Sequence, residues 1–280
     1  YSGSLLVYAA VKGVPAYYMV FLAAVLCSLA VSLRLPVKYR VNLVLALVAA
    51  GITLLILEVG LVLAEETGSG DTRTKIEVIN DLRAQGIDAN PPFAQTLFIK
   101  DGLDIGADRT VLPLGGVANE TVVYCNINDA GEWITFESDE HGFRNPKGIW
   151  GSDRIDIVAV GDSMIFGGCV ADGKHTTDFI RERYEATLNL SSGGSGPFLY
   201  LAMIKEYLGD LEPPVVLFFF TGLNDLGGLM FERAKEHPMA TRYLESTYKQ
   251  NLVKKQSVID SALKTFADRE MEGFEGTATA

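Results

Sequence analysis

The stretch "RIDIVAVGDS" at residues 154–163 decides how this chain folds. Its β-branched run at 155–160 is typical of a central strand of a parallel sheet, which is buried on both faces. The tripeptide Gly-Asp-Ser follows directly. A serine that comes straight after such a strand, ahead of a glycine-containing turn, exposes its hydroxyl above the edge of the sheet. Ser163 is therefore a candidate nucleophile, and Asp162 is expected to bond the nearby backbone and fix the turn.

The chain after this stretch alternates between helix-like and strand-like segments. A helix is expected over 172–186 and a short strand over 187–190, followed by a helix over 197–208 with Pro197 in its first turn. The wholly apolar segment 215–220 predicts a third strand. This order indicates an α/β fold, with a parallel sheet that carries helices on both faces.

Polar or glycine-rich stretches follow the carboxyl end of each predicted strand. They are "GDS" at 161–163, "SSGGSGP" at 191–197 and "TGLND" at 221–225. In open α/β sheets the ligand site lies outside these strand ends. We therefore expect the three loops to meet in space.

The three loops carry residue types suited to acyl transfer, which needs hydrogen-bond donors aimed at a developing oxyanion. The backbone N–H of Ser163 is one candidate donor. Gly194 is a second, because its missing Cβ lets the backbone approach a substrate. The side-chain amide of Asn224 is a third. Asp225 is expected to cap the following helix.

These residues resemble the SGNH (GDSL-type) hydrolase superfamily. "GDS" is similar to its first block, which implies that Ser163 is the nucleophile. "NLSSGGSG" at 189–196 resembles the second block and implies an oxyanion-hole role for Gly194. "GLND" at 222–225 matches the Gly-x-Asn-Asp of the third block, with Asn224 as the oxyanion-hole asparagine.

Two further stretches extend the resemblance to roughly residues 139–265. "DEHGFRNP" at 139–146 resembles the lead-in of membrane-anchored bacterial members, and "KKQSVIDSAL" at 254–263 resembles another stretch of such proteins. The chain departs from the family in one respect, because no Asp-x-x-His follows the third block, which is where the family has its fourth block.

The missing block matters because a serine is a weak nucleophile without an adjacent base. The chain has only three histidines, His141, His175 and His237. His175 follows the first strand too closely, His237 precedes a proline in a charged turn, and His141 comes before the domain. We expect either that the base lies beyond residue 280, in a chain cut at both ends, or that the protein is a degenerate member that does not hydrolyse.

The N-terminal region is apolar and predicts a membrane anchor at 1–64. Helices are expected at about 13–33 and 41–64, each near the roughly 20 residues that cross a bilayer. Basic residues in the linker "RLPVKYR" at 34–40 place it in the cytoplasm by the positive-inside rule. Everything after residue 64 is then expected on the periplasmic or extracytoplasmic side of a bacterial inner membrane.

We expect a linker and β-rich lead-in at 65–150 and an SGNH-like domain, incomplete at its C-terminus, at 151–280. Short strands are predicted at 96–99, 110–114, 121–127 and 133–136, and an amphipathic helix or helix pair at 239–266. Cys125 and Cys169 would both face an oxidising compartment and are a possible disulfide. The alternative is two buried thiols.

Composition narrows the function classes. The formal net charge of −11 argues against a nucleic-acid partner, which requires a basic face. No Cys/His spacing suggests a metal, and no phosphate-binding loop or other cofactor motif occurs. The expected partners are the lipid bilayer, an acylated glycan substrate and other membrane subunits.

The sequence therefore predicts a membrane-anchored serine esterase that deacylates an envelope glycan or lipid. An O-acyltransferase would use the same residues and pass the acyl group to a sugar hydroxyl instead of water. A catalytically inactive subunit of a membrane complex is the alternative from a different class.

Overall fold

The computed structural model describes residues 36–66, 71–127, 132–209, 211–234 and 237–278. The chain divides into two compact units, Tyr1–Gly68 and Ser69–Ala280. The described part of the first unit is dominated by the helix α3 (Val37–Glu66). All the sheets and the predicted site residues belong to the second unit.

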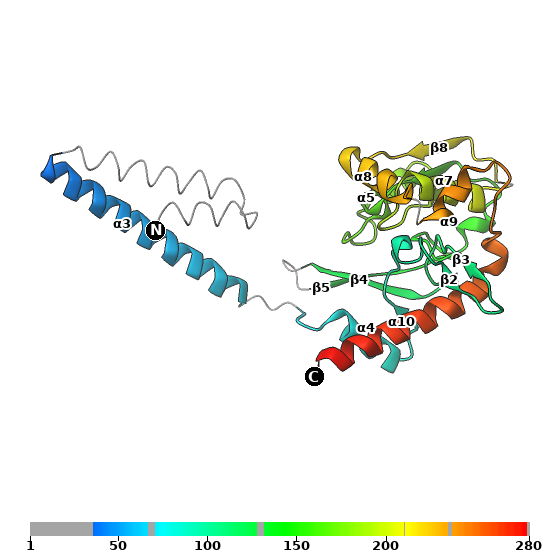
Figure 1. Cartoon of the computed structure of the whole chain (residues 1–280), viewed down its shortest axis with the longest axis horizontal. Helices are drawn as coiled ribbons and strands as arrows, with labels where there is room; N and C mark the ends of the chain where they lie inside the picture. The colour runs from blue at the N-terminus through cyan, green and yellow to red at the C-terminus, as the bar shows by residue number, and fades with distance from the viewer. Residues whose placement is uncertain (1–35, 67–70, 128–131, 210, 235–236, 279–280) are drawn as a thin grey trace. The chain divides into compact units, whose positions relative to one another are not determined.

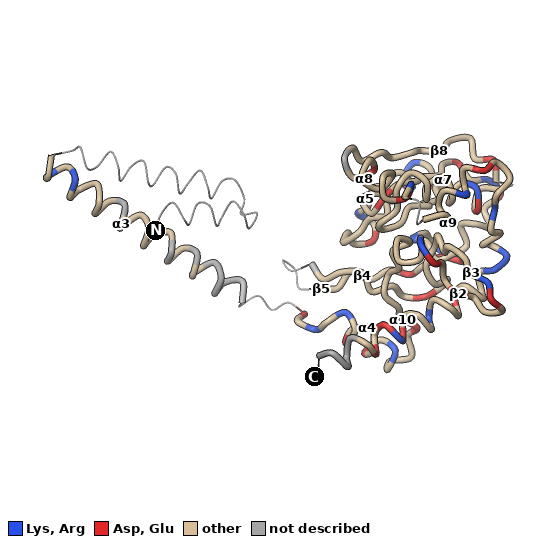
Figure 2. Tube along the Cα trace, viewed as in Figure 1, with Lys and Arg blue, Asp and Glu red and all other residues tan. Residues whose placement is uncertain are grey.

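Helix α3 is long and apolar enough to cross a membrane. Its 30 residues span about 45 Å, and the segment Val37–Leu54 meets the length and composition of a spanning helix. A signal sequence meets the same criterion. Lys38 and Arg40 lie at the start of the helix (Figure 2). The predicted helix at 41–64 lies within α3, whereas the predicted helix at 13–33 falls outside the described residues. The described residues therefore hold one candidate span where two were expected in the chain.

The second unit contains the parallel sheet that the sequence predicts. Its strands are β6 (Ile157–Val160), β7 (Thr187–Asn189) and β8 (Val215–Phe218), in the order β7-β6-β8. Both pairings are parallel. All four residues of the central strand β6 are buried, as its β-branched sequence predicts. The expectation of a mixed α/β fold with parallel strands is confirmed.

Strand β8 is an edge strand of this sheet in the described part of the chain. Its apolar side chains are largely exposed, with Phe218 retaining 48% of its accessible surface and Val215 and Val216 more than 40% each. The strand predicted at 215–220 is thus confirmed as β8, and its apolar composition reflects strand propensity rather than burial.

Short helices and loops connect and cover the parallel strands. They are α5 (Ser163–Phe166), α6 (Thr176–Arg181), α7 (Pro197–Tyr207), α8 (Gly222–Glu232) and α9 (Pro238–Thr241), with 3₁₀ turns η2 (Ile149–Gly151), η3 (Arg242–Leu244) and η4 (Val253–Lys255). The prediction of a helix at 197–208 is confirmed by α7. The helix predicted over 172–186 is shorter, because residues before Thr176 form a turn with Gly173 at a φ of 78°.

The residues before the parallel sheet form a second set of strands. A sheet of order β1-β4-β5 joins β1 (Ala89–Asn90), β4 (Thr121–Ile127) and β5 (Glu132–Glu137), while β2 (Leu103–Asp104) pairs with β3 (Thr110–Val111). The strands predicted at 121–127 and 133–136 are confirmed. The strand predicted at 96–99 is wrong, since the 3₁₀ turn η1 (Gln95–Leu97) occupies this segment.

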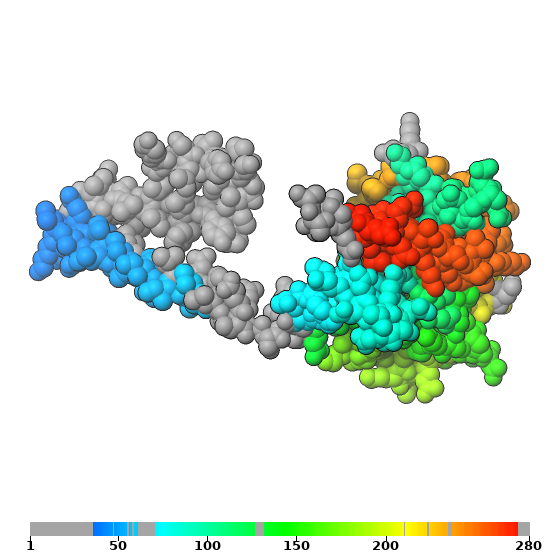
Figure 3. All heavy atoms as spheres, turned by 90° about the horizontal axis from the view of Figure 1, so that it is seen from below, coloured from blue at the N-terminus to red at the C-terminus, as the bar shows by residue number. Residues whose placement is uncertain are grey.

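Helices α4 (Lys75–Ala84) and α10 (Gln256–Ala278) lie side by side at the surface of this unit (Figures 1 and 3). An ion pair of 2.8 Å joins Arg83 of α4 to Asp268 of α10. The helix predicted within 239–266 is thus divided between α9, the 3₁₀ turns and the first half of α10.

A common hydrophobic core spans the predicted lead-in and the predicted domain. Its buried members range from Phe98 and Leu112 in the lead-in, through Val158 of β6, to Leu252 and Leu263 near the C-terminus. The described residues of the lead-in from 71 onward and those of 151–280 therefore pack as parts of the same compact unit.

Candidate active site

Ser163 lies at the end of the central strand, where the sequence places it. Strand β6 ends at Val160, and Ser163 is the first residue of the short helix α5. The Asp162 side chain caps this helix by accepting a hydrogen bond of 2.9 Å from the Met164 N–H. Ser163 is half-buried, and its hydroxyl forms no hydrogen bond to any residue that the structure describes.

Asn224 is tied directly to the turn that carries Ser163. The Asn224 amide donates a hydrogen bond of 2.5 Å to Oδ2 of Asp162, although Asn224 follows β8 and Asp162 follows β6. Asn224 is exposed and sits in the first turn of α8. Its amide has a second N–H that this contact leaves free.

The loop after β7 contacts the same turn. The Ser195 hydroxyl lies 2.7 Å from the Ser192 carbonyl oxygen and 3.3 Å from that of Gly161. Gly194 is exposed and has a φ of +75°, a conformation that favours glycine. A Cβ at Gly194 would lie 3.4 Å from the Ala94 side chain, so the segment around η1 borders this loop.

All three loops therefore meet at the carboxyl ends of the parallel strands. The chain passes from β6 to β7 on one side of the sheet and then returns to β8 on the other. Such a reversal of strand order opens a crevice above the central strand, which is where open α/β sheets bind ligands. Ser163, Gly194 and Asn224 share this edge.

Two buried carboxylates lie beneath these loops. Asp225 accepts hydrogen bonds from the Tyr200 hydroxyl, at 2.5 Å, and from the Thr221 N–H. The residue at the N-cap position of α8 is Thr221, not Asp225 as expected; Asp225 lies within the first turn and accepts from the Thr221 N–H. Glu232 accepts hydrogen bonds from the N–H groups of Gly196 and Phe198, at 2.6 and 2.9 Å, and so caps the start of α7.

The environment of Glu232 favours its neutral form. Burial raises the pKa of Glu232 to about 7, and the nearby charge of Asp225 acts in the same direction. The backbone N–H donors oppose this shift without cancelling it. Glu232, which binds the Gly196 N–H in the loop of Gly194, thus has a pKa close to neutral pH.

The three histidines are held by other contacts. His237 Nδ1 lies 2.8 Å from the carbonyl oxygen of Phe231. Phe231 comes seven residues after Asn224 in α8, which corresponds to a rise of roughly 10 Å along the helix. His175 lies against Gly167 at the far end of α5 from Ser163. The His141 ring packs on Trp150, with centroids 4.6 Å apart.

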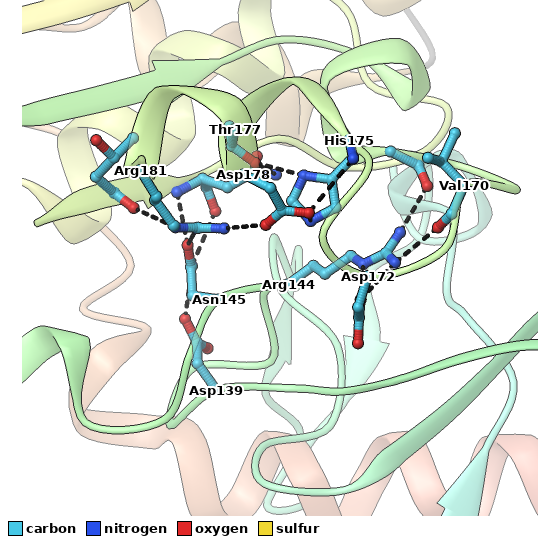
Figure 4. Close-up of polar contacts among 12 residues, drawn as sticks. Asp139, Arg144, Asn145, Val170, Asp172, His175, Thr177, Asp178 and Arg181 are labelled. Carbon is cyan, nitrogen blue, oxygen red and sulfur yellow. Dashed lines mark hydrogen bonds and ion pairs between the residues drawn. The ribbon is translucent and has the colours of Figure 1, made fainter. Parts of the chain in front are cut away.

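His175 is also electrostatically unsuited to act as a base for Ser163. Its Nδ1 lies 2.7 Å from the Thr177 hydroxyl, and its Nε2 lies 3.0 Å from Asp178. Burial lowers the pKa of His175 to about 4, which outweighs the opposite effect of Asp178. The ring therefore belongs to the polar network in Figure 4.

Arg144 forms a separate group of contacts in the same view and binds the chain that follows α5 (Figure 4). Its guanidinium donates to the carbonyl oxygens of Gly167 and Val170, at 2.6 and 2.8 Å. It also pairs with Asp172 at 2.6 Å and lies over the Phe136 ring, 4.7 Å from its centroid. Only 3% of the Arg144 side chain is exposed, so these contacts replace its solvent shell.

Asn145, the next residue, joins the lead-in to strand β7 (Figure 4). Its Oδ1 accepts hydrogen bonds from the Asn189 N–H and from Arg181, while its Nδ2 donates to Asp139. Asn189 in turn donates to the Ile165 carbonyl oxygen in α5, at 3.1 Å. Arg144 and Asn145 of the "GFRN" segment thus hold the chain that follows α5 and the end of strand β7.

The structure joins Cys125 of β4 to Cys169 in a disulfide, with Cα atoms 5.6 Å apart. This link fixes the loop after α5 to the lead-in sheet, on the side that Arg144 also holds. The neighbouring Tyr124 was not expected at the site. A Cβ on either Gly168 or Gly193 would lie 3.1 Å from its hydroxyl, so the phenol reaches between the chain after α5 and the second loop.

The sequence pattern identified the three loops but not the residues that hold them in place. Tyr124 and Glu232 carry no motif, and only the folded chain brings them to the loops. Arg144 and Asn145 fall within the resembling stretch "DEHGFRNP", which was the available signal. Among the described residues, no cluster of His, Cys, Asp and Glu has the grouping of a metal site.

Comparisons of the chain with protein-family models, with curated proteins and with solved structures give no match. The resemblance to SGNH hydrolases therefore rests on the three loops and the flanking stretches alone.

Proposed function

We propose that this chain is an SGNH-like serine esterase that removes an acyl group from an envelope glycan or lipid. Ser163 attacks the ester carbonyl, and the Ser163 N–H, Gly194 and the Asn224 amide hold the oxyanion. The observation that carries the proposal is the hydrogen bond from Asn224 to Asp162, because it brings the third loop to the turn of the nucleophile. Neither a metal nor an organic cofactor is required for this chemistry.

The proposed setting is the periplasmic side of a membrane, with α3 as an anchor. Its support is the apolar length of α3 and the disulfide between Cys125 and Cys169, which persists in oxidising compartments. An O-acyltransferase would use the same three groups, with a sugar hydroxyl as acceptor.

The positions of the histidines favour a second candidate, a catalytically inactive SGNH-like subunit of a membrane complex. None of the three histidines is positioned by its described contacts to accept the proton of Ser163. The esterase therefore needs a base other than these three, and we assign that role to no described residue.

Hydrolysis of p-nitrophenyl acetate separates the two candidates. We expect wild-type protein to release p-nitrophenol and Ser163→Ala to lose this activity by at least about 1000-fold. Ser152→Ala, which changes an exposed serine of the same unit, should retain it. Equal rates for wild type and Ser163→Ala would contradict the esterase and favour the inactive subunit.

A further inference from the structure

A small pocket lies between the lead-in sheet and the loop of Gly194. Ser192 and Gly193 of that loop form one wall, and Phe166 of α5 forms another. The remaining lining is mainly apolar and comes from the lead-in: Pro91, Pro92, Phe93, Val117, Val122, Tyr124 and Phe136, with Asn90, Gly116, Glu120 and Gly142.

The pocket adjoins the proposed site through the second loop, because Gly193 in its wall is next to Gly194 in the chain. The hydroxyl of Tyr124, another lining residue, lies 3.1 Å from the position of a Cβ on Gly168, in the chain after α5. Gln95 donates hydrogen bonds to the Leu114 carbonyl oxygen, at 2.9 Å, and to the Ser192 hydroxyl, at 2.5 Å. The pocket wall thus includes part of the second loop and lies against the chain that follows α5.

The chemistry of the pocket suits a short acyl group. The space open to the centre of a water-sized sphere is about 30 Å³, whereas a single water needs roughly 10–15 Å³ on this measure. Phe136 and Phe166 pack edge to face, with centroids 5.5 Å apart. The acidic side chain in the lining, Glu120, is already paired with Lys264 and accepts a hydrogen bond from Asn90.

We propose that this pocket receives the acyl group of the ester and limits it to about the size of acetyl, with Val122 and Tyr124 setting the limit. This inference rests on the proposed function of Ser163. The lead-in then supplies acyl specificity, while the parallel sheet supplies the nucleophile and the oxyanion donors.

Val122 and Val123 provide a matched pair for the test. Both are buried in β4, but they point to opposite faces, and Val123 belongs to a separate apolar cluster with Val78 and Ile79. Each substitution by alanine removes the same volume. Only Val122→Ala enlarges the pocket.

The probes are alkyl phosphonofluoridates with a methyl or a butyl group on phosphorus. In the reaction Ser163 Oγ bonds to phosphorus, the P–F bond breaks, and the serine proton leaves with the fluoride. Labelling of full-length protein is followed by intact mass. We expect wild type to favour the methyl probe and Val122→Ala to raise the butyl-to-methyl rate ratio at least about tenfold. Val123→Ala should keep the wild-type ratio.

A second pair tests the part assigned to Tyr124. Gly193 does not have a positive φ, so alanine there meets chiefly the Tyr124 hydroxyl, 3.1 Å from the new Cβ. Gly193→Ala should slow labelling by the methyl probe about tenfold. Adding Tyr124→Phe should restore the rate, because it removes the atom that the new methyl group meets.

The outcomes separate the pocket from the proposed function. Equal butyl-to-methyl ratios in wild type, Val122→Ala and Val123→Ala, with labelling still at Ser163, would overturn the pocket and leave the esterase standing. Failure of Tyr124→Phe to rescue Gly193→Ala would overturn the role of Tyr124. An absence of labelling at Ser163 with either probe would overturn both the esterase and the pocket.

Discussion

The side-chain amide of Asn224 donates a hydrogen bond to the carboxylate of Asp162, across 62 residues of sequence. Asp162 also caps α5, so the contact places the amide next to the turn of Ser163. The same relationship leaves the other amide N–H free for a substrate oxygen. Asp162 therefore links the turn of the proposed nucleophile to a candidate oxyanion donor.

Removal of the Asn224 amide should reduce turnover more than it reduces stability. We expect Asn224→Ala to lower kcat for an ester substrate by about 100- to 1000-fold, as the loss of an oxyanion donor typically does. KM should change little. Leu226→Ala, at an exposed position of the same helix, should leave kcat unchanged. An Asn224→Ala enzyme with wild-type kcat would exclude the amide from catalysis.

Conservative replacement of Arg144 should loosen the loop that follows Ser163. Lysine keeps the charge but not the planar fork that reaches the carbonyl oxygens of Gly167 and Val170 together. We expect Arg144→Lys to reduce the free energy of unfolding by about 2–3 kcal/mol, because buried acceptors lose their donors. Denaturant unfolding measures this change. Arg154→Lys, at an exposed ion pair with Asp156, is the control and should be neutral.

The disulfide should contribute a large part of the stability of the second unit. Its sequence separation of 44 residues corresponds to about 4 kcal/mol from restriction of the unfolded chain. In guanidinium unfolding of the wild type, a reductant should lower the free energy of unfolding by this amount. In Cys125→Ser, the reductant should cause no such change. Of the three cysteines, only Cys27 should react with a thiol reagent in unreduced, denatured protein. Reaction of all three would rule out the bond.

The raised pKa of Glu232 predicts a specific pH dependence. The folded state holds the proton up to about pH 7, whereas the unfolded carboxyl releases it near 4.5. The contribution of Glu232 to stability is therefore present below about pH 4.5 and is lost as the pH rises towards 7. Glu232→Gln cannot titrate, so its stability relative to wild type should rise by about 3 kcal/mol over this window. Parallel stability curves for the two proteins would contradict the assignment.

The central part of the fold could be predicted from sequence because local pattern and burial agree there. The run at 155–160 is β-branched and becomes the fully buried β6. The turn residues that follow each strand fix where the strands end, so the edge that carries the three loops could be predicted as well. Pro197 likewise marks the first turn of α7.

Elsewhere tertiary contacts override the local pattern. Residues 96–99 have a strand-like composition, yet Gln95 bonds to Leu114 and Ser192 and holds the start of this segment in a 3₁₀ turn. Asp172 was expected in a helix but pairs with Arg144, far away in sequence. The supports of the site escape sequence analysis for the same reason, since each acts across a long chain separation.

Active-site labelling tests the central claim, that Ser163 is an activated nucleophile, most directly. Full-length wild type and Ser163→Ala are treated with a fluorophosphonate probe, and the modified peptide is identified by mass spectrometry. We expect a single adduct on Ser163 in the wild type and none in the variant. Equal labelling of the two proteins, or no labelling of either, would contradict the claim.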